Sequence, residues 1–194
     1  MGEIILETPR LRLRPFTAED SADVYAYARD PAVGPPAGWP PHESYMESWY
    51  IIQTVFSQPH VFAMELKEKR KVIGSIGFVG GHPAGEHPDC PDDEIGYALS
   101  RAFWGRGLTG EAMAAVERYG FETLGLRRIW CAHYAGNWRS RRVMEKRGFQ
   151  FRFARPTDVD LMNEVRQTYF YELTEERWRE RVSGALWSGG KRIH

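Results

Sequence analysis

A glycine-rich loop near the middle of the chain constrains its fold more than any other segment. Residues 103–112 read FWGRGLTGEA, and they join a strand-like run to a helix-like run. Glycine reaches backbone conformations that other residues avoid, so this composition permits a tight turn with free N–H groups. Together with the positive end of the following helix, such N–H groups form a cradle for an anion. We therefore expect this loop to bind a phosphate group.

The length and charge of the chain limit the remaining possibilities. With 194 residues it is long enough for one sizeable domain, so we expect a single domain over residues 1–194. Lys plus Arg equals Asp plus Glu at 26 each, so no overall field draws the chain to nucleic acid or to an anionic membrane. No apolar run approaches the roughly 18 residues that span a bilayer, and the first residues lack signal-peptide features. We expect a cytoplasmic protein with no nucleic-acid or membrane partner.

The apolar pattern predicts a mixed α/β chain with a sheet of about seven strands flanked by helices. Period-two alternation indicates strands, and apolar residues three and four apart indicate helices. In the second helix, Tyr45, Trp49, Ile52 and Phe56 have the spacing of a buried stripe. The predicted strands are residues 6–15, 61–66, 72–79, 95–99, 128–134, 149–153 and 168–173, and helices are predicted to begin near Thr17, His42, Leu108, Asn137 and Thr174.

The glycine loop also matches a dinucleotide-binding fingerprint, Gly105-x-Gly107-x-x-Gly110. That fold needs an acidic residue about 20 positions further on, at the end of the next strand. Here the next strand ends in residues 133–137, HYAGN, which contain no carboxylate. Two predicted helices in succession, followed by three predicted strands, also break the strict alternation of that fold. The context therefore disfavours a dinucleotide, and the absence of a Gly-Lys-Ser/Thr sequence excludes a P-loop.

The order of elements and the loop together resemble the GCN5-related N-acetyltransferase (GNAT) superfamily, in which this loop holds the pyrophosphate of coenzyme A. Within it, the chain is similar to the Rim-type group that includes ribosomal-protein N-terminal acetyltransferases. Two positions depart from the superfamily pattern, Trp104 at the head of the loop and Thr109 near its end. The matching segments span nearly the whole chain: residues 7–16 (ETPRLRLRPF), 94–99 (EIGYAL), 104–107 (WGRG), Asn137-x-x-Ser140, 145–149 (EKRGF) and Tyr171-x-Leu173-Thr174 leading to Trp178.

This resemblance implies a GNAT fold and an enzyme that moves the acetyl group of acetyl-CoA to a primary amine. The amine attacks directly in a ternary complex, so holding the two reactants together supplies much of the acceleration. A non-catalytic CoA-binding or sensory module on the same fold is the alternative. The basic run after Asn137 is either a solvated face or a contact for the 3′-phosphate of CoA. The cofactor-binding residues implied are Leu99, Arg106, Gly107, Thr109, Gly110, Asn137 and Ser140.

The reaction needs a base for the amine and a donor for the departing thiolate. Glu94, at the start of the fourth strand, is the best candidate base, although it could be a solvated strand-end residue. Ser140, in the first turn of the helix that Asn137 caps, is the candidate donor, since the helix dipole favours a nearby anion. Ordinary helix capping by Asn137 is compatible with both roles. Tyr134 is a substitute donor that we rank lower.

We expect the acceptor to be a small-molecule amine or the N-terminus of a peptide or protein, and the enzyme to be a monomer or a homodimer. The resemblance places the acceptor wall in the stiff loop of residues 34–42, so we expect Trp39 and His42, with Tyr97, to contact the acceptor.

The turn-rich segment from residue 80 to residue 93 raises a metal site as a further hypothesis. Its spacing matches no standard zinc pattern, and we expect no metal cofactor. Cys90 and Cys131 lie in different settings, which argues against a disulfide framework. The candidate ligands are His82, His87, Cys90, Asp92 and Asp93.

Overall fold

A computed structural model of the chain describes residues 3–85 and 89–188. Eight strands in this part form one sheet in the order β1-β2-β3-β4-β5-β6-β8-β7. Neighbouring strands are antiparallel except β5 and β6, which are parallel, so the predicted mixed sheet is confirmed. The strands are β1 (Leu6–Glu7), β2 (Leu11–Arg14), β3 (Val61–Leu66), β4 (Lys71–Phe78), β5 (Asp92–Leu99), β6 (Arg128–Tyr134), β7 (Gln150–Val159) and β8 (Glu164–Thr174).

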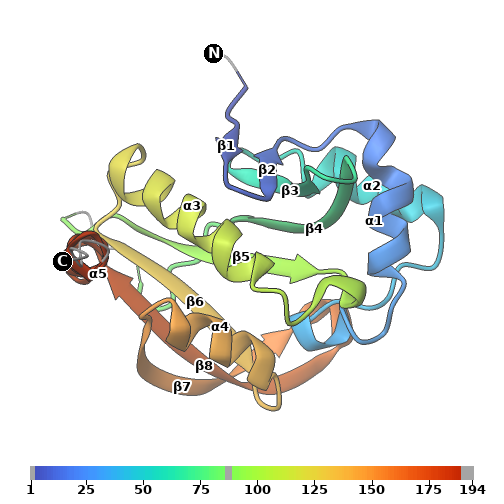
Figure 1. Cartoon of the computed structure of the whole chain (residues 1–194). Helices are drawn as coiled ribbons and strands as arrows, with labels where there is room; N and C mark the ends of the chain where they lie inside the picture. Colours follow the sequence, from blue (N-terminus) through green and yellow to red (C-terminus); the bar gives the residue numbers. More distant parts are fainter. Residues whose placement is uncertain (1–2, 86–88, 189–194) are drawn as a thin grey trace.

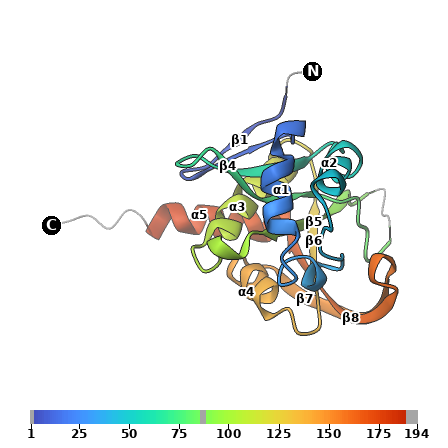
Figure 2. The ribbon, with the colours of Figure 1, turned by 90° about the vertical axis from the view of Figure 1, so that its right-hand side faces the viewer.

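Helices cover both sides of the sheet. In Figure 2, α3 and α4 lie on one side of β5 and β6, and α2 lies on the other. Figure 1 shows α5 at the far end of the sheet from α1 and α2. The α-helices are α1 (Ser21–Ala28), α2 (Tyr45–Thr54), α3 (Leu108–Glu122), α4 (Trp138–Lys146) and α5 (Glu175–Ser188), and the short 3₁₀ turns are η1 (Ala18–Asp20), η2 (Pro35–Ala37), η3 (Arg101–Phe103) and η4 (Asp160–Met162).

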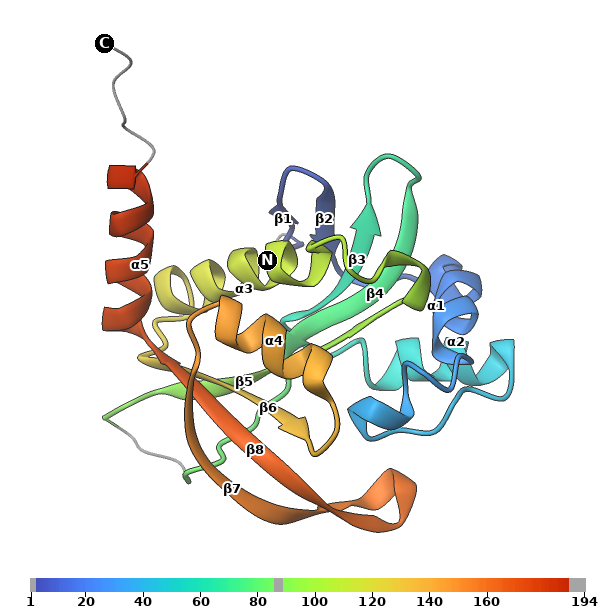
Figure 3. The ribbon, with the colours of Figure 1, turned by 60° about the horizontal axis from the view of Figure 1, so that its bottom comes forward.

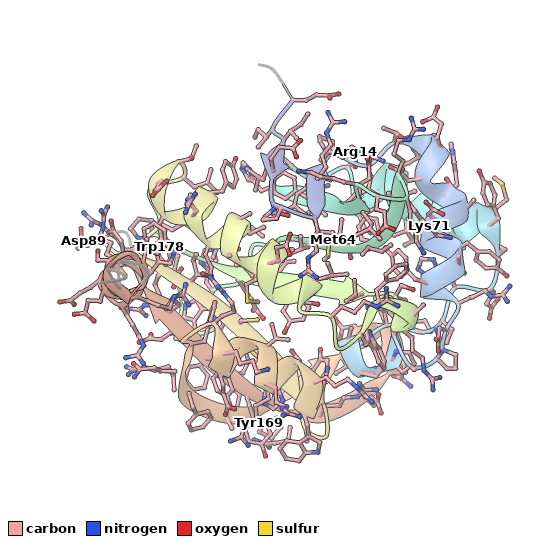
Figure 4. All side chains as sticks on the ribbon, in the orientation of Figure 1. Arg14, Met64, Lys71, Asp89, Tyr169 and Trp178 are labelled. Carbon is pink, nitrogen blue, oxygen red and sulfur yellow. The ribbon has the colours of Figure 1, made fainter. Side chains whose placement is uncertain are left out.

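The apolar core is divided by the sheet into a larger and a smaller cluster. The larger one packs α3 against the strands, and it includes Met64 and Trp178, which Figure 4 labels. The smaller one packs Val24 of α1 and Ile52 of α2 against Ala98 of β5. Because successive strand residues point to opposite faces, Glu94 shares the face of Ala98, toward α1 and α2.

The first predicted strand is interrupted, which is why the sheet has eight strands rather than about seven. Residues 6–15 form β1 and β2, an antiparallel pair joined by a turn at Thr8 and Pro9. Pro9 has no N–H to donate to a ladder, and the Thr8 hydroxyl accepts a hydrogen bond from the Leu11 amide at 2.8 Å. The apolar alternation of residues 6–15 therefore belongs to two strands, with the turn between β1 and β2 inside it.

The last two strands are longer than predicted. β7 and β8 form a hairpin around η4, in which Asn163 has a left-handed backbone with φ of 49°. Figure 3 shows this hairpin curving away from the body of the sheet. Most of β7 is exposed and it contains Pro156, which an edge strand tolerates. The outer half of β7 therefore lacks the apolar alternation that indicates a strand.

The predicted buried stripe of α2 is wrong in part. Tyr45 and Trp49 are 45% and 39% exposed, whereas Ser48 and Ile52 are buried. Ser48 turns inward because its hydroxyl lies 2.8 Å from Nδ1 of His42. The buried face of α2 therefore includes Ser48, bonded to the half-buried His42, in place of the neighbouring Trp49.

Candidate functional site

The central feature of the site is an opening between β5 and β6. The two strands pair in parallel only from Asp92 and Arg128 to Glu94 and Trp130. Beyond Glu94, β5 continues to Leu99 beside β4, while β6 continues to Tyr134 beside β8. The strands therefore diverge at Glu94, and the edge of β5 that faces the opening has no partner strand over residues 95–99, all of which the structure describes.

A cavity of about 1470 Å³ occupies this opening and extends past both ends of it. It is larger than the ~300–1,000 Å³ of ordinary small-molecule pockets, so it can hold an extended ligand or two ligands together. Its walls come from β4, β5, β6, the glycine loop, the first turn of α3, the length of α4, the end of α2, the segment around η2 and the tip of the β7–β8 hairpin.

The glycine loop has the geometry that its composition predicts. Gly105 and Gly107 have left-handed φ angles of 76° and 75°, and Gly107 is the N-cap of α3. The amides of Thr109 and Gly110 lie in the first turn, where the helix offers them no acceptor, and both residues line the cavity. The loop is therefore able to present several N–H groups to an anion.

Arg106 is the one predicted loop residue that does not line the described cavity. Its guanidinium lies over the ring of Phe103, 5.2 Å from the centroid, and its carbonyl accepts from Nη1 of Arg10 at 3.0 Å. Arg10 also forms an ion pair with Glu111 of α3 at 2.7 Å. These contacts fasten the loop to the β1–β2 turn and leave the backbone to face the cavity.

The start of α4 brings Asn137, Ser140 and Tyr97 together. The side-chain oxygen of Asn137 accepts from the Ser140 amide at 3.2 Å, so Asn137 is the N-cap that the sequence predicts. Its Nδ2 donates to the carbonyl of Pro36 at 3.0 Å, which links α4 to η2. The Ser140 hydroxyl lies 2.7 Å from the Tyr97 hydroxyl, and burial raises the pKa of Tyr97 well above its usual value.

Leu99, predicted to contact the cofactor, is at the end of β5 and lines the cavity. Its carbonyl accepts from Nε1 of Trp104 at 2.8 Å, which holds the head of the glycine loop against the strand. The Arg139 guanidinium lies over the Trp104 ring, 4.5 Å from its centroid. Trp104 therefore connects β5, the glycine loop and α4.

Glu94 lies at the point where β5 and β6 separate, and it lines the cavity. Burial, with the nearby charge of Asp93, raises the pKa of Glu94 to about 7. Asp93 is held by the amides of Gly80 and Glu94, which donate to its Oδ1 at 2.8 and 2.7 Å. β5 begins at Asp92, inside the segment expected to be a loop, so Glu94 is an inner strand residue rather than a solvated end.

Trp39 and His42 line the cavity beside η2, with ring centroids 5.4 Å apart. Burial lowers the pKa of His42. Tyr97 also lines the cavity, but its hydroxyl is on the Ser140 side. The structure thus places two of the predicted acceptor contacts on one wall and the third beside the candidate donor.

Sequence reasoning missed the contribution of the β7–β8 hairpin to this cavity. Thr157, Asp158 and Leu161 line it from the hairpin tip. Arg166 of the same hairpin donates to the carbonyl of Pro35, and its guanidinium lies 5.2 Å from the Tyr134 ring centroid. Only the unexpected length of the strands carries these residues to the site.

The candidate metal ligands have other partners. Nδ1 of His82 lies 2.6 Å from Oδ1 of Asp92, and Oδ2 of Asp92 accepts from Nε1 of Trp130 at 2.7 Å. Cys90 lies 3.6 Å from Nη2 of Arg128, and His87 is outside the described residues. Within residues 3–85 and 89–188, no three His, Cys, Asp or Glu side chains are placed to hold a metal ion together. In the same ranges, no helix is both long and apolar enough to cross a membrane.

The fold is that of an acetyltransferase. The family model described as "Acetyltransferase (GNAT) domain" matches residues 10–150. The chain therefore belongs to the GNAT acetyltransferase family, as the sequence motifs indicate.

Relatives and solved structures agree with this assignment. "Uncharacterized N-acetyltransferase YoaA" of Bacillus subtilis (strain 168) is 33% identical over 152 residues, which are 75% of this chain and 82% of that protein. An acetyltransferase (GNAT family) from Bacillus anthracis has a TM-score of 0.77 at 24% identity, covering 89% of this chain and 99% of that one. A ribosomal-protein-S5-alanine acetyltransferase from Vibrio fischeri has a TM-score of 0.69 at 19% identity, covering 90% and 98%. Both structural similarities concern the fold alone.

Proposed function

We propose that this enzyme transfers the acetyl group of acetyl-CoA to a primary amine, with both substrates held in the opening between β5 and β6. The observation that carries the proposal is the separation of these strands at Glu94, which opens a cavity lined both by Glu94 and by the glycine loop. One opening then serves the ligand's phosphates, its extended arm and the attacking amine.

The residues present fit coenzyme A. The backbone amides of the glycine loop suit the pyrophosphate, and the unpaired edge of β5 suits an elongated arm that carries amide groups. Arg139, Arg142, Lys146 and Arg147 line the same end of the cavity and match the negative charge of the cofactor. When bound, acetyl-CoA supplies the acetyl group as a thioester that an amine can attack.

Glu94 suits the role of the base. A pKa of about 7 leaves the carboxylate largely ionised just above neutral pH, yet basic enough to accept a proton from an ammonium group. The side chain shares a sheet face with Ala98, toward the acceptor wall around η2.

Ser140 suits the role of the donor. Its hydroxyl is in the first turn of α4, where the helix dipole favours a developing anion. The Tyr97 hydroxyl, kept protonated by burial, can donate to Ser140 Oγ and leave the Ser140 proton directed to the thiolate.

A protein N-terminus is the finer candidate for the acceptor. Its support is the sequence similarity to the Rim-type group and the fold shared with the Vibrio fischeri protein. A small-molecule amine remains the other candidate, and the cavity volume accommodates either.

Two measurements test the proposal. Calorimetric titration with CoA is expected to show binding, and binding of 3′-dephospho-CoA is expected to be weaker if a basic residue of α4 meets the 3′-phosphate. Release of CoA from acetyl-CoA is then followed with polyamines, aminoglycosides, amino acids and peptides with free N-termini. Absence of CoA binding would contradict the proposal, and binding without acetyl transfer to any amine would favour a non-catalytic module.

A further inference from the structure

The charged residues that line the cavity are segregated by sign. Among the described lining residues, every Lys and Arg comes from residues 139–147, at the start, middle and end of α4. The carboxylates are Asp93 and Glu94 at the separation of β5 and β6, and Asp158 on the hairpin. The cavity therefore has a cationic wall beside the glycine loop and a wall without cations on the side of η2, α2 and the hairpin.

Other basic groups near the second wall are neutral or engaged. His60 also lines the cavity, and its Nδ1 lies 2.8 Å from the Tyr119 hydroxyl. Burial lowers the pKa of His42, and likewise that of His133, so both favour the uncharged form. Arg166 is not a lining residue of the described cavity, and its guanidinium binds Glu164 and the carbonyl of Pro35. A negative charge on the acceptor would have no cationic side chain to meet on this wall.

The rim of the same wall carries exposed apolar side chains beside the polar Gln58 and Asp158. Val55, Val79 and Leu161 line the cavity and are 51%, 60% and 73% exposed. They come from three separate segments, just after α2, just after β4 and in η4. Exposed apolar side chains gathered around one opening mark a surface that an apolar ligand covers.

We infer that the acceptor is a primary ammonium on an apolar body, with no carboxylate next to the amine. This inference rests on the proposed function and adds the chemical class of the substrate. Glu94 attracts the ammonium and then takes its proton, while the apolar rim covers the body. A carboxylate next to the amine would lie close to Glu94 with no cation to compensate it, which selects against free amino acids.

Matched acceptors isolate the carboxylate. Phenylalaninamide and phenylalanine differ in this charge and in the pKa of the amine, which the carboxylate raises, so each kcat/KM is corrected for the fraction of amine that is unprotonated at the assay pH. Leucinamide and leucine form a second pair. We expect kcat/KM for each amide to exceed that for its acid by at least about tenfold, the size of one unscreened charge repulsion in a partly buried site. Phenethylamine and a short peptide beginning with phenylalanine distinguish a small amine from a protein N-terminus. The better substrate of the two shows which kind of acceptor the enzyme uses.

A change of charge on the rim tests where the selection arises. Leu161→Lys adds a cation to the lining, so the preference for the amide over the acid is expected to fall about threefold, the effect of an exposed ion pair. Val165→Lys is the matched control, since Val165 is on the same hairpin, is 65% exposed and does not line the described cavity. Its preference is expected to equal that of the unmodified enzyme.

The outcomes separate this inference from the function on which it rests. Equal rates for amide and acid, or an identical effect of both lysine substitutions, would overturn the inference while the acetyltransferase proposal stands. CoA binding in calorimetry with no transfer to any of these amines would also overturn it. Absence of CoA binding would overturn the proposed function and the inference together.

Discussion

The hydroxyl groups of Tyr97 and Ser140 lie 2.7 Å apart and join the middle of β5 to the first turn of α4. These residues are 43 positions apart in the chain, and both line the cavity. Burial keeps the Tyr97 hydroxyl protonated by raising its pKa. Both hydroxyl groups therefore keep their protons, and the pair can donate a hydrogen bond without a change of protonation state.

Replacing Tyr97 with Phe is expected to lower kcat about fivefold and to change the affinity for CoA little. The substitution removes one neutral hydrogen bond, worth about 1 kcal/mol, and leaves the ring in place. Steady-state kinetics and CoA titration measure the two quantities. In the double variant with Ser140→Ala, the loss is expected to equal that of Ser140→Ala alone, because Tyr97 acts through Ser140. Fully additive losses would show that the two hydroxyls act separately.

The base role of Glu94 predicts a specific pH dependence. Ionised Glu94 is the active form, so kcat/KM is expected to rise with pH through about 7 and to level off above it. Glu94→Gln is expected to remove this limb and to lower the plateau about 100-fold. If the pH profile of Glu94→Gln matched that of the unmodified enzyme, Glu94 would not be the base.

Asp93→Asn provides a control on the cause of that pKa. The negative charge of Asp93 contributes to the raised pKa of Glu94, so its removal is expected to move the limb to lower pH. The Asn side-chain oxygen can still accept from the amides of Gly80 and Glu94, which preserves the local backbone. A limb that moves to higher pH, or stays in place, would contradict this account.

The order of elements could be predicted from sequence because local patterns determine it. The glycines of the loop, the cap at Asn137 and the left-handed Gly148 with φ of 83° are each set by a few neighbouring residues. The interruption at Pro9 and the polar inward turn of Ser48 show the limit of this approach. In both places a single proline or polar residue determines the local structure, although the spacing of the apolar residues predicts a different one.

The site is predictable only in part, since its geometry depends on contacts between distant segments. Motif residues on β5, the glycine loop and α4 do line one cavity, but the raised pKa of Glu94 arises from burial at a strand separation. The hairpin wall at Asp158 and Leu161 depends on strands whose exposed outer halves carry no apolar signal. No local pattern reports either feature.

The left-handed geometry of the glycine loop gives a prediction about cofactor binding. Gly107→Ala places a Cβ on a residue with φ of 75° at the N-terminus of α3, which costs about 1 kcal/mol and displaces the amides of the cradle. We expect the Kd for CoA to rise about fivefold. Gly125→Ala is the matched control, because Gly125 has φ of 69° and does not line the described cavity. Equal Kd values for the two variants would show that the loop amides do not hold the cofactor.

Arg166 gives a prediction about the acceptor wall. Its bond to the Pro35 carbonyl and its position over the Tyr134 ring hold η2 against the hairpin. Arg166→Gln is expected to raise KM for the amine about threefold, from the loss of one charge-assisted bond, and to leave the Kd for CoA unchanged. Arg152→Gln, which removes a 3.3 Å ion pair with Glu172 outside the cavity, serves as the control. A rise in the Kd for CoA with no change in KM for the amine would show that Arg166 supports the cofactor side of the cavity and not the acceptor wall.

A buried ion cluster gives a prediction about stability. Glu117 of α3 is 0% exposed and accepts from Nε of Arg147 at 2.9 Å and from Nη2 of Arg181 at 2.6 Å, so it joins α3 to the end of α4 and to α5. Glu117→Gln leaves two partly buried guanidinium groups without their counter-charge, and the free energy of unfolding is expected to fall by about 3–5 kcal/mol.

Urea denaturation measures this free energy of unfolding, and Glu145→Gln is the control variant. Glu145 forms an exposed i,i+4 pair with Arg141 at 2.7 Å, whose loss is expected to cost at most about 0.5 kcal/mol. Because Arg147 also lines the cavity, Glu117→Gln is expected to weaken CoA binding even where the variant is fully folded. Equal stabilities for the two variants would mean that solvent, rather than Glu117, balances these arginines.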